Sequence, residues 1–141
     1  MQPRLYLPNG KVNSLGNCYH YLGFGYAGGN GLSYDEAFRR LSWSKNQTDI
    51  PYFSGAAVLI KAEVLKTVGL FDERLFLYHE DLELGLRLHC FGWGMQVVPE
   101  AQVIHYYQFT ARAENLYYME RNRFLVWFSY FKLPTLILLA V

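Results

Sequence analysis

Cysteine is scarce in this sequence of 141 residues, and neither sign of charge dominates it. The two cysteines, Cys18 and Cys90, lie far apart and match neither zinc-site spacing nor a disulfide framework, so we expect ordinary thiols in a reducing compartment. Lys plus Arg (13) nearly equals Asp plus Glu (12), and a net charge of +1 provides no basic field to hold nucleic acid. We therefore expect no nucleic-acid partner.

Hydrophobic residues make up 52% of the chain and aromatic residues 18%, which predicts a folded chain rather than a disordered one. The length suits a single domain or part of one. Residues 1–10 are polar and contain prolines, so they do not resemble a secretory signal. Acidic residues outnumber basic ones only in residues 54–111, and we therefore expect any carboxylate chemistry in that part.

The hydrophobic pattern predicts a mixed α/β protein without internal repeats. Residues 1–53 are rich in Gly, Asn, Ser and Tyr and are expected to be dominated by loops. The remaining expected elements are a buried strand at 54–60, a short helix at 61–68, a buried helix at 80–91, short strands at 95–98 and 103–105, and a long helix at 114–131.

The C-terminal residues 124–141 are almost wholly apolar and read FLVWFSYFKLPTLILLAV. One interpretation is a buried C-terminal helix. The other, which we favour, is an aromatic-rich interfacial helix leading into a membrane segment, because aromatics and a Lys before an aliphatic run are typical of a membrane boundary.

Two adjacent carboxylates, Glu80 and Asp81, begin the helix expected at 80–91. Acidic residues there interact favourably with the exposed backbone amides, so helix capping alone could explain them. The preceding residues Phe76, Leu77 and Tyr78 would partly desolvate the acids, as a general base requires. Both interpretations stay open on the residues alone.

Other polar positions also allow two interpretations. His105 follows an apolar strand and is either a satisfied edge histidine or a metal ligand. Arg121 and Arg123 precede the apolar run and suit either a membrane anchor or a diphosphate. Gly23, Gly25 and Gly28 have phosphate-loop spacing but lack the strand and helix of such a loop.

Several motifs in a fixed order carry a resemblance to a known family. They are SGA (54–56), VGLFDE (68–73), FLYHEDLEL (76–84), Arg87, GW (92–93), VPEA (98–101), VIH (103–105) and ERNR (120–123). This series closely resembles the second half of family 2 glycosyltransferases, especially the rhamnosyltransferase-like branch that builds bacterial surface polysaccharides. The resemblance covers residues 54–141 and implies a GT-A type α/β fold, inversion at the sugar carbon and a divalent cation, Mg or Mn.

The resemblance also implies roles for individual residues. Asp81 matches the catalytic base, and Glu80 would position it or touch the acceptor. His105 matches a metal-binding histidine of several relatives. The remaining implied contacts are acceptor binding by Ser54, Gly55 and Ala56, and donor diphosphate binding by Arg121 or Arg123.

The family's Asp-x-Asp cluster is missing from this sequence. We therefore predict a C-terminal catalytic half that is inactive alone, with a loop-rich segment at 1–53, an acceptor-side half at 54–113 and a helix leading into a membrane segment at 114–141. The implied partners are a nucleotide-sugar donor, a lipid-linked or polysaccharide acceptor and the membrane, at the cytoplasmic face of the bacterial inner membrane. Two alternatives are a non-catalytic membrane-associated module, in which Glu80 and Asp81 only cap a helix, and a small zinc hydrolase, whose ligand spacing is missing.

Overall fold

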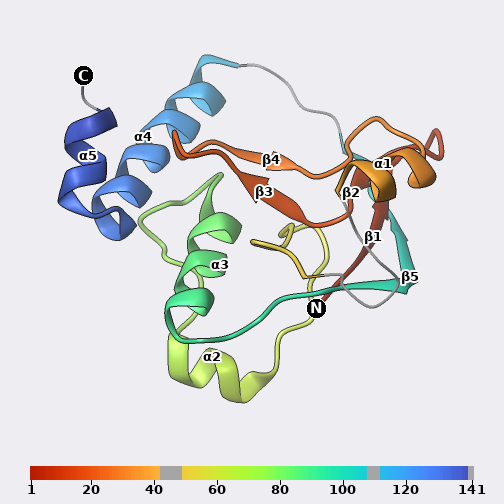
Figure 1. Ribbon diagram of the computed structural model, residues 1–141, viewed down its shortest axis with the longest axis horizontal. Coiled ribbons are helices and arrows are strands. Elements are labelled where there is room, and N and C mark those ends of the chain that lie inside the picture. The colour runs from red at the N-terminus through yellow and green to blue at the C-terminus, as the bar shows by residue number, and fades with distance from the viewer. Residues whose placement is uncertain (42–48, 108–111, 140–141) are drawn as a thin grey trace.

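The computed structural model describes residues 1–41, 49–107 and 112–139 and has a mixed α/β architecture (Figure 1). In chain order, the elements are β1 (Gln2–Tyr6), β2 (Val12–Ser14), β3 (Asn17–Tyr19), β4 (Gly25–Ala27), α1 (Tyr34–Arg40), α2 (Ala62–Val68), α3 (Glu80–Cys90), β5 (Val97–Ile104), α4 (Ala113–Tyr130) and α5 (Leu133–Leu139). The predicted α/β class is confirmed. The three predicted domain ranges each include residues outside the described part, and their boundaries stay predictions.

A three-stranded sheet has the order β2-β1-β5. Strand β1 pairs antiparallel with β2 and parallel with β5, so that Leu5 lies opposite Ser14 on one side and Val103 on the other. Strands β3 and β4 form a separate antiparallel hairpin. The N-terminal part, expected to be dominated by loops, also contains four short strands and α1, which alternate with turns.

Two further strand predictions differ from the structure. Residues 54–60 form no strand, because small, exposed residues such as Gly55 and Ala56 offer little apolar surface to bury. The pieces expected at 95–98 and 103–105 are joined in one strand, β5. A register shift opposite Pro3 and Arg4, whose partners are Val98 and Gln102, accommodates the extra residues between them.

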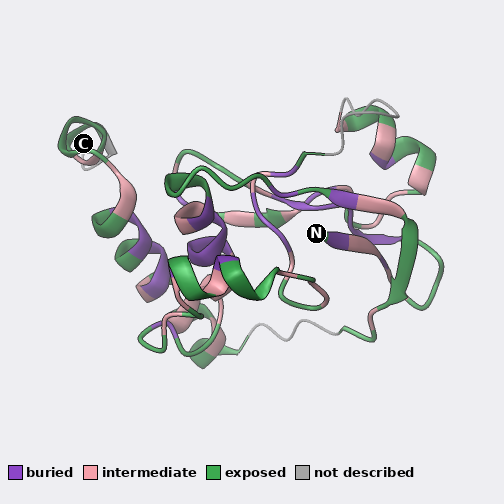
Figure 2. Ribbon diagram, turned by 90° about the horizontal axis from the view of Figure 1, so that it is seen from below, coloured by how far each residue is buried: buried purple, intermediate pink, exposed green. Residues whose placement is uncertain are grey.

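The main apolar core lies between α2, α3 and the start of β5. Phe53, Leu84 and Val97 are each at most 2% exposed there. Figure 2 shows buried residues along α3 and on one side of α4. Helix α3 begins as predicted and buries the apolar side of its first three turns, which fixes the position of its N-terminus and of the carboxylates there.

Helix α4 is followed by α5 after an extended residue, Phe131. Asn122, Arg123, Val126 and Trp127 are the buried residues of α4. Over the described ranges 1–41, 49–107 and 112–139, no helix combines the length and the apolar character needed to cross a bilayer. The expected start of a spanning helix is not supported by these helices, since α5 has seven residues and is separated from α4 by non-helical residues.

Candidate active site

Asp81 lies in the first turn of α3 and faces the loop at residues 54–56. Its Oδ2 accepts a hydrogen bond from the backbone N–H of Gly55 at 3.0 Å, and its Oδ1 accepts one from Leu82 at 2.8 Å. Both carboxylate oxygens therefore have a fixed direction. The sequence analysis predicted Asp81 and Gly55 for one site. The structure brings them together although they are 26 residues apart in the chain.

The pKa of the Asp81 carboxyl is raised to about 6, chiefly because burial penalises its charged form. The hydrogen bond from Gly55 opposes this shift, while the neighbouring negative charge of Glu80 adds to it. A carboxylate with this pKa is ionised at neutral pH but accepts a proton more readily than an ordinary aspartate. This property suits a general base.

A cavity of about 200 Å³ opens beside Asp81 and is rich in aromatic side chains. The β3–β4 hairpin contributes Tyr26 to its wall, the segment before α3 contributes Tyr78, and the residues after β5 contribute Tyr107. Tyrosine presents a flat apolar face and a hydroxyl group. The cavity therefore suits a ligand that combines apolar ring faces with several hydroxyls, as a sugar does.

Tyr52 lies under the same cavity and is only 4% exposed. Burial, together with the negative charge of Asp81, raises the pKa of Tyr52 far above its usual value, so its hydroxyl stays protonated. A Cβ at Gly25 would lie 2.3 Å from the Tyr52 hydroxyl oxygen. Glycine is therefore required on β4 for the hairpin to approach this ring.

His79 and Glu80 lie at the N-terminus of α3, next to Asp81. His79 lines the cavity, has a left-handed backbone with φ 66°, and has its pKa lowered by burial. The His79 Nε2 and the Glu80 Oε2 are buried without a hydrogen-bond partner among the described residues. Buried polar atoms in proteins are usually paired, so these two atoms are exceptions to the usual pattern.

Ser54 and Ala56 flank the Gly55 amide that holds Asp81. The Ser54 N–H donates to Gln2 Oε1 at 2.6 Å, and the Ala56 N–H donates to Ser54 Oγ at 3.3 Å. Gln2 is fully buried, so this loop is tied to β1. The predicted small-residue segment thus lies beside the carboxylate, and acceptor binding by its residues stays a prediction.

His105 follows β5 and is not among the residues that line the cavity. Its Nδ1 lies 2.9 Å from Asn13 Oδ1, and its ring stacks on Tyr107 at a centroid distance of 5.2 Å. In the part of the chain that the structure describes, no three His, Cys, Asp or Glu side chains are grouped closely enough to hold a metal ion. These residues therefore do not by themselves fit the divalent cation that the resemblance implies.

Arg121 contacts the protein backbone with its guanidinium group. Its Nη2 donates to the carbonyls of Arg74 at 2.6 Å and Leu75 at 3.0 Å, and its Nε donates to Asn122 Oδ1 at 2.9 Å. The predicted diphosphate contact of Arg121 stays a prediction. The observed contacts direct this side chain toward the segment before α3.

Arg123 is 8% exposed and is paired through all three guanidinium nitrogens. Its Nε and Nη2 donate to the Glu120 carboxylate, and its Nη1 donates to the Leu22 carbonyl at 3.1 Å. The guanidinium also lies over the rings of Phe24, Phe124 and Trp127. These contacts tie α4 to the turn before β4, and diphosphate binding by Arg123 also stays a prediction.

The sequence did not identify the tyrosines of the cavity. Tyr26, Tyr52 and Tyr107 come from three separate parts of the chain, and 12 tyrosines in all gave no reason to select them. The available signal for the first was its neighbour Gly25, because a glycine within a short strand indicates close approach of another group. For the other two the sequence held no such signal.

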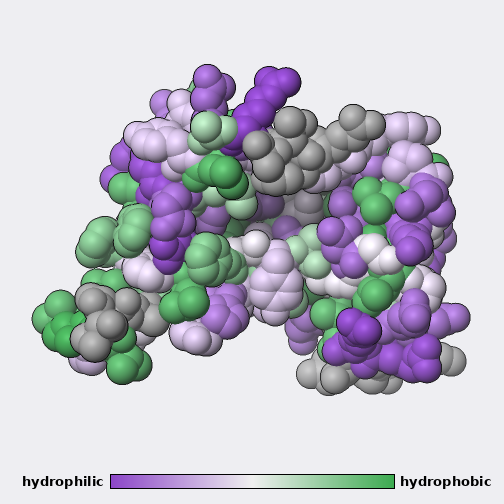
Figure 3. Space-filling view, turned by 90° about the horizontal axis from the view of Figure 1, so that it is seen from above, coloured by the Kyte–Doolittle hydropathy of each residue, from purple (hydrophilic) through white to green (hydrophobic). Residues whose placement is uncertain are grey.

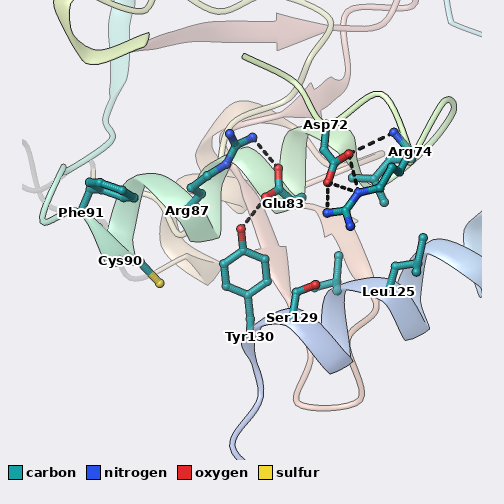
Figure 4. A pocket seen from close by; sticks show the side chains of 11 residues that line it. Asp72, Arg74, Glu83, Arg87, Cys90, Phe91, Leu125, Ser129 and Tyr130 are labelled. Atoms are coloured by element: carbon teal, nitrogen blue, oxygen red, sulfur yellow. Dashed lines mark hydrogen bonds and ion pairs between the residues drawn. The ribbon is translucent and has the colours of Figure 1, made fainter. Parts of the chain in front are cut away.

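A second cavity, of about 320 Å³, lies between α3 and α4 on another side of α3 (Figure 4). The hydroxyl of Tyr130 donates to the buried carboxylate of Glu83, which also accepts from Arg87 at 2.7 Å. Arg87 further donates to the carbonyls of Val68 and Leu70, each at 2.7 Å. These contacts join α3 to α4 and to the end of α2, so we assign this cluster to the scaffold.

Comparison with known proteins agrees with the motif order. The family model described as "Glycosyltransferase like family 2" matches residues 30–125, which is more than half of the chain. No solved structure matches the chain significantly.

Two curated relatives match parts of the chain. An N-acetylglucosaminyl-diphospho-decaprenol L-rhamnosyltransferase of Mycobacterium tuberculosis is 37% identical over 70 residues, covering 50% of this chain and 23% of the relative. The O-antigen biosynthesis protein RfbC of Myxococcus xanthus is 31% identical over 77 residues, covering 55% of this chain and 6% of the relative. The chain thus aligns with less than a quarter of the length of either relative.

Proposed function

The chain belongs to the family 2-like glycosyltransferases, and from this membership we propose that it carries the acceptor-side catalytic half of an inverting GT-A type enzyme. The observation that carries the proposal is the Asp81 carboxylate, fixed by two backbone N–H groups at the edge of a tyrosine-lined cavity. The resemblance to family 2 transferases supports the proposal that this residue is the general base of the reaction.

In the proposed reaction, an acceptor hydroxyl in the cavity donates its proton to Asp81. The acceptor oxygen forms a bond to the anomeric carbon of the donor sugar from the face opposite the leaving group. The bond between that carbon and the nucleoside diphosphate breaks, and the diphosphate leaves with the electron pair. Glu80 helps to keep the Asp81 pKa raised, and the protonated Tyr52 is a donor beside the acceptor.

A divalent cation, Mg²⁺ or Mn²⁺, stays a prediction from the family resemblance. The described residues contribute His105 but no cluster of ligands, so the proposed reaction has no step that depends on a metal ion. Donor diphosphate binding is likewise proposed for the full-length protein, which we propose to resemble its longer relatives in having a nucleotide-binding half.

The relatives' names favour a nucleotide-activated sugar, rhamnose in the first instance, and a lipid-linked or polysaccharide acceptor. We propose that the enzyme works at the cytoplasmic face of a bacterial inner membrane. Apolar side chains gather over α4 and α5 (Figure 3), and we propose that this surface lies against the lipid. The exposed apolar residues of these two helices outside the cavity of Figure 4 are Leu116, Phe124, Phe128, Leu133, Ile137 and Leu138.

The test is Asp81→Asn in the full-length protein, assayed with radiolabelled nucleotide sugar and a lipid-linked acceptor. Loss of the general base should reduce turnover about 100-fold or more, with donor binding nearly unchanged. Glu73→Gln, which removes an exposed carboxylate that does not line the cavity, is the matched control and should retain activity. If the Asp81 variant turns over normally, Asp81 is only a helix-capping acid and the proposed role is wrong.

A further inference from the structure

The segment that leads into α3 has an unusual backbone. Phe76, Tyr78 and His79 have φ angles of 58°, 66° and 66°, in the left-handed region that side chains other than glycine rarely adopt. They are the three non-glycine residues with positive φ in the described part of the chain. Such conformations persist only where the surrounding structure holds them, and they cluster at functional sites.

Asn122 of α4 supplies that support. It is fully buried, and its Nδ2 donates to the carbonyls of Leu75 at 2.8 Å, Leu77 at 2.8 Å and Tyr78 at 2.7 Å. A left-handed turn directs these carbonyls away from helical partners, and the two N–H bonds of the Asn122 amide are shared among the three of them.

Arg121 fixes the orientation of this amide. Its Nε donates to Asn122 Oδ1, so the amide nitrogen must face the strained segment rather than its oxygen. Its Nη2 also donates to the carbonyls of Arg74 and Leu75. The two neighbouring residues of α4 thus form one clamp over residues 74–78.

The clamp acts on the site through the chain that it holds. Tyr78 and His79 line the cavity, and Asp81 follows two residues after His79. A backbone change at 76–79 would move the first turn of α3 and lengthen the 3.0 Å bond between Gly55 and Asp81.

We propose that Arg121 and Asn122 are positioning residues, which hold the left-handed segment so that Asp81 faces the acceptor hydroxyl. The inference rests on the proposed function, since it assigns the clamp to the same reaction. The inference gives Arg121 a role at the acceptor side of the site, whereas the sequence had suggested that Arg121 binds the donor diphosphate.

The experiment compares Asn122→Ala, Arg121→Lys and Val64→Ala in the full-length transferase, with kcat and the donor KM measured separately. Because misplacing a catalytic group by about 1 Å can cost 10²-fold in rate, we expect Asn122→Ala to lower kcat about 100-fold with the donor KM within about twofold. The single ammonium group of a lysine at position 121 cannot contact both the amide and the two carbonyls, so Arg121→Lys should lower kcat about tenfold. Val64, a 6% exposed core residue of α2, controls for lost stability and should retain kcat.

Three outcomes overturn the inference. It is wrong if Asn122→Ala keeps the kcat of the Val64→Ala control. It is also wrong if Arg121→Lys raises the donor KM at unchanged kcat, because that result would favour diphosphate binding by Arg121. If Asn122→Ala does not fold, Arg121→Lys decides, and wild-type kcat in that variant rejects the clamp. An active Asp81→Asn would instead reject the proposed function.

The pH profile separates positioning from general stability. A displaced Asp81 becomes more hydrated, so the acidic limb of the kcat/KM profile of Arg121→Lys should shift to lower pH. A purely structural role would leave this limb in place, and that result would also count against the clamp.

Discussion

Asp81 is a residue whose charged form the fold disfavours. Burial and the adjacent Glu80 both raise its pKa, and two N–H groups compensate only in part. A group that binds its proton more tightly in the folded state than in the unfolded state stabilises the folded state at low pH. This stabilisation is lost as the pH rises through the pKa of the folded state. The proposed general base should therefore reduce stability at neutral pH.

We expect this cost in the pH dependence of unfolding. The folded pKa is about 6 and the unfolded value about 3.9, so the stability of wild type relative to Asp81→Asn should fall by about 2 kcal/mol between pH 4 and pH 7. Urea unfolding of both chains at several pH values measures this difference. A constant difference across that range would mean that Asp81 is not desolvated, whereas Val64→Ala should lower stability equally at each pH.

Sequence reasoning selected the carboxylate together with Gly55 and Tyr78, which lie near it, but not the other tyrosines of the cavity. Asp81 lies within an ordered series of motifs and begins an apolar helix, so both family resemblance and local pattern select it. Tyr52 and Tyr107 reach the cavity only through tertiary packing, which no local pattern encodes. The strained backbone at Tyr78 was equally unpredictable, because it depends on Asn122 from α4.

At the scale of elements, helices were predicted better than strands. Helices α2, α3 and α4 have apolar residues at helical spacing and begin and end within two residues of the predicted limits. Strands β2, β3 and β4 have three residues each, too few for an alternating pattern. They are held by pairing with a neighbouring strand, β2 with β1 and β3 with β4. The apolar run at 54–60 looked like a strand but has no ladder to join.

The contact between α3 and α4 depends on a buried carboxylate. Glu83 is 7% exposed and accepts from both Arg87 and Tyr130 (Figure 4). A buried charge is tolerated only when its oxygens are paired. This interaction fixes the helix that carries Asp81 against the helix that carries Asn122.

We expect Tyr130→Phe to lower the free energy of unfolding by about 1–3 kcal/mol, because it leaves one oxygen of the buried Glu83 without its donor. Thermal or urea unfolding measures the loss. Tyr117→Phe, at a 61% exposed position of the same helix, is the matched control and should change stability by less than about 0.5 kcal/mol.

A double-mutant cycle identifies the source of the loss. In a Glu83→Gln background, Tyr130→Phe should cost less, because the buried charge is gone. Equal costs in the two backgrounds would show that the hydroxyl stabilises the fold through other contacts.

At the scale of the whole molecule, apolar surface is unevenly distributed. Phe128 of α4 is 72% exposed, and Leu138 of α5 is 76% exposed. The net charge of +1 gives little overall attraction to an anionic surface. Any affinity of this end for lipid should therefore come from apolar burial, with Lys132 near the headgroups.

The proposed membrane contact predicts that the chain cosediments with phosphatidylglycerol-containing vesicles and that Phe128→Asp weakens this binding about tenfold or more. Burying a phenylalanine side chain contributes about 1.5–3 kcal/mol, and each 1.4 kcal/mol changes an equilibrium constant tenfold.

Leu70→Asp, at a 69% exposed apolar position outside α4 and α5, is the control and should bind like wild type. Equal loss in both variants would indicate nonspecific adsorption, and no loss in either would place the lipid contact elsewhere. Added salt should change binding little, because the attraction is apolar rather than electrostatic.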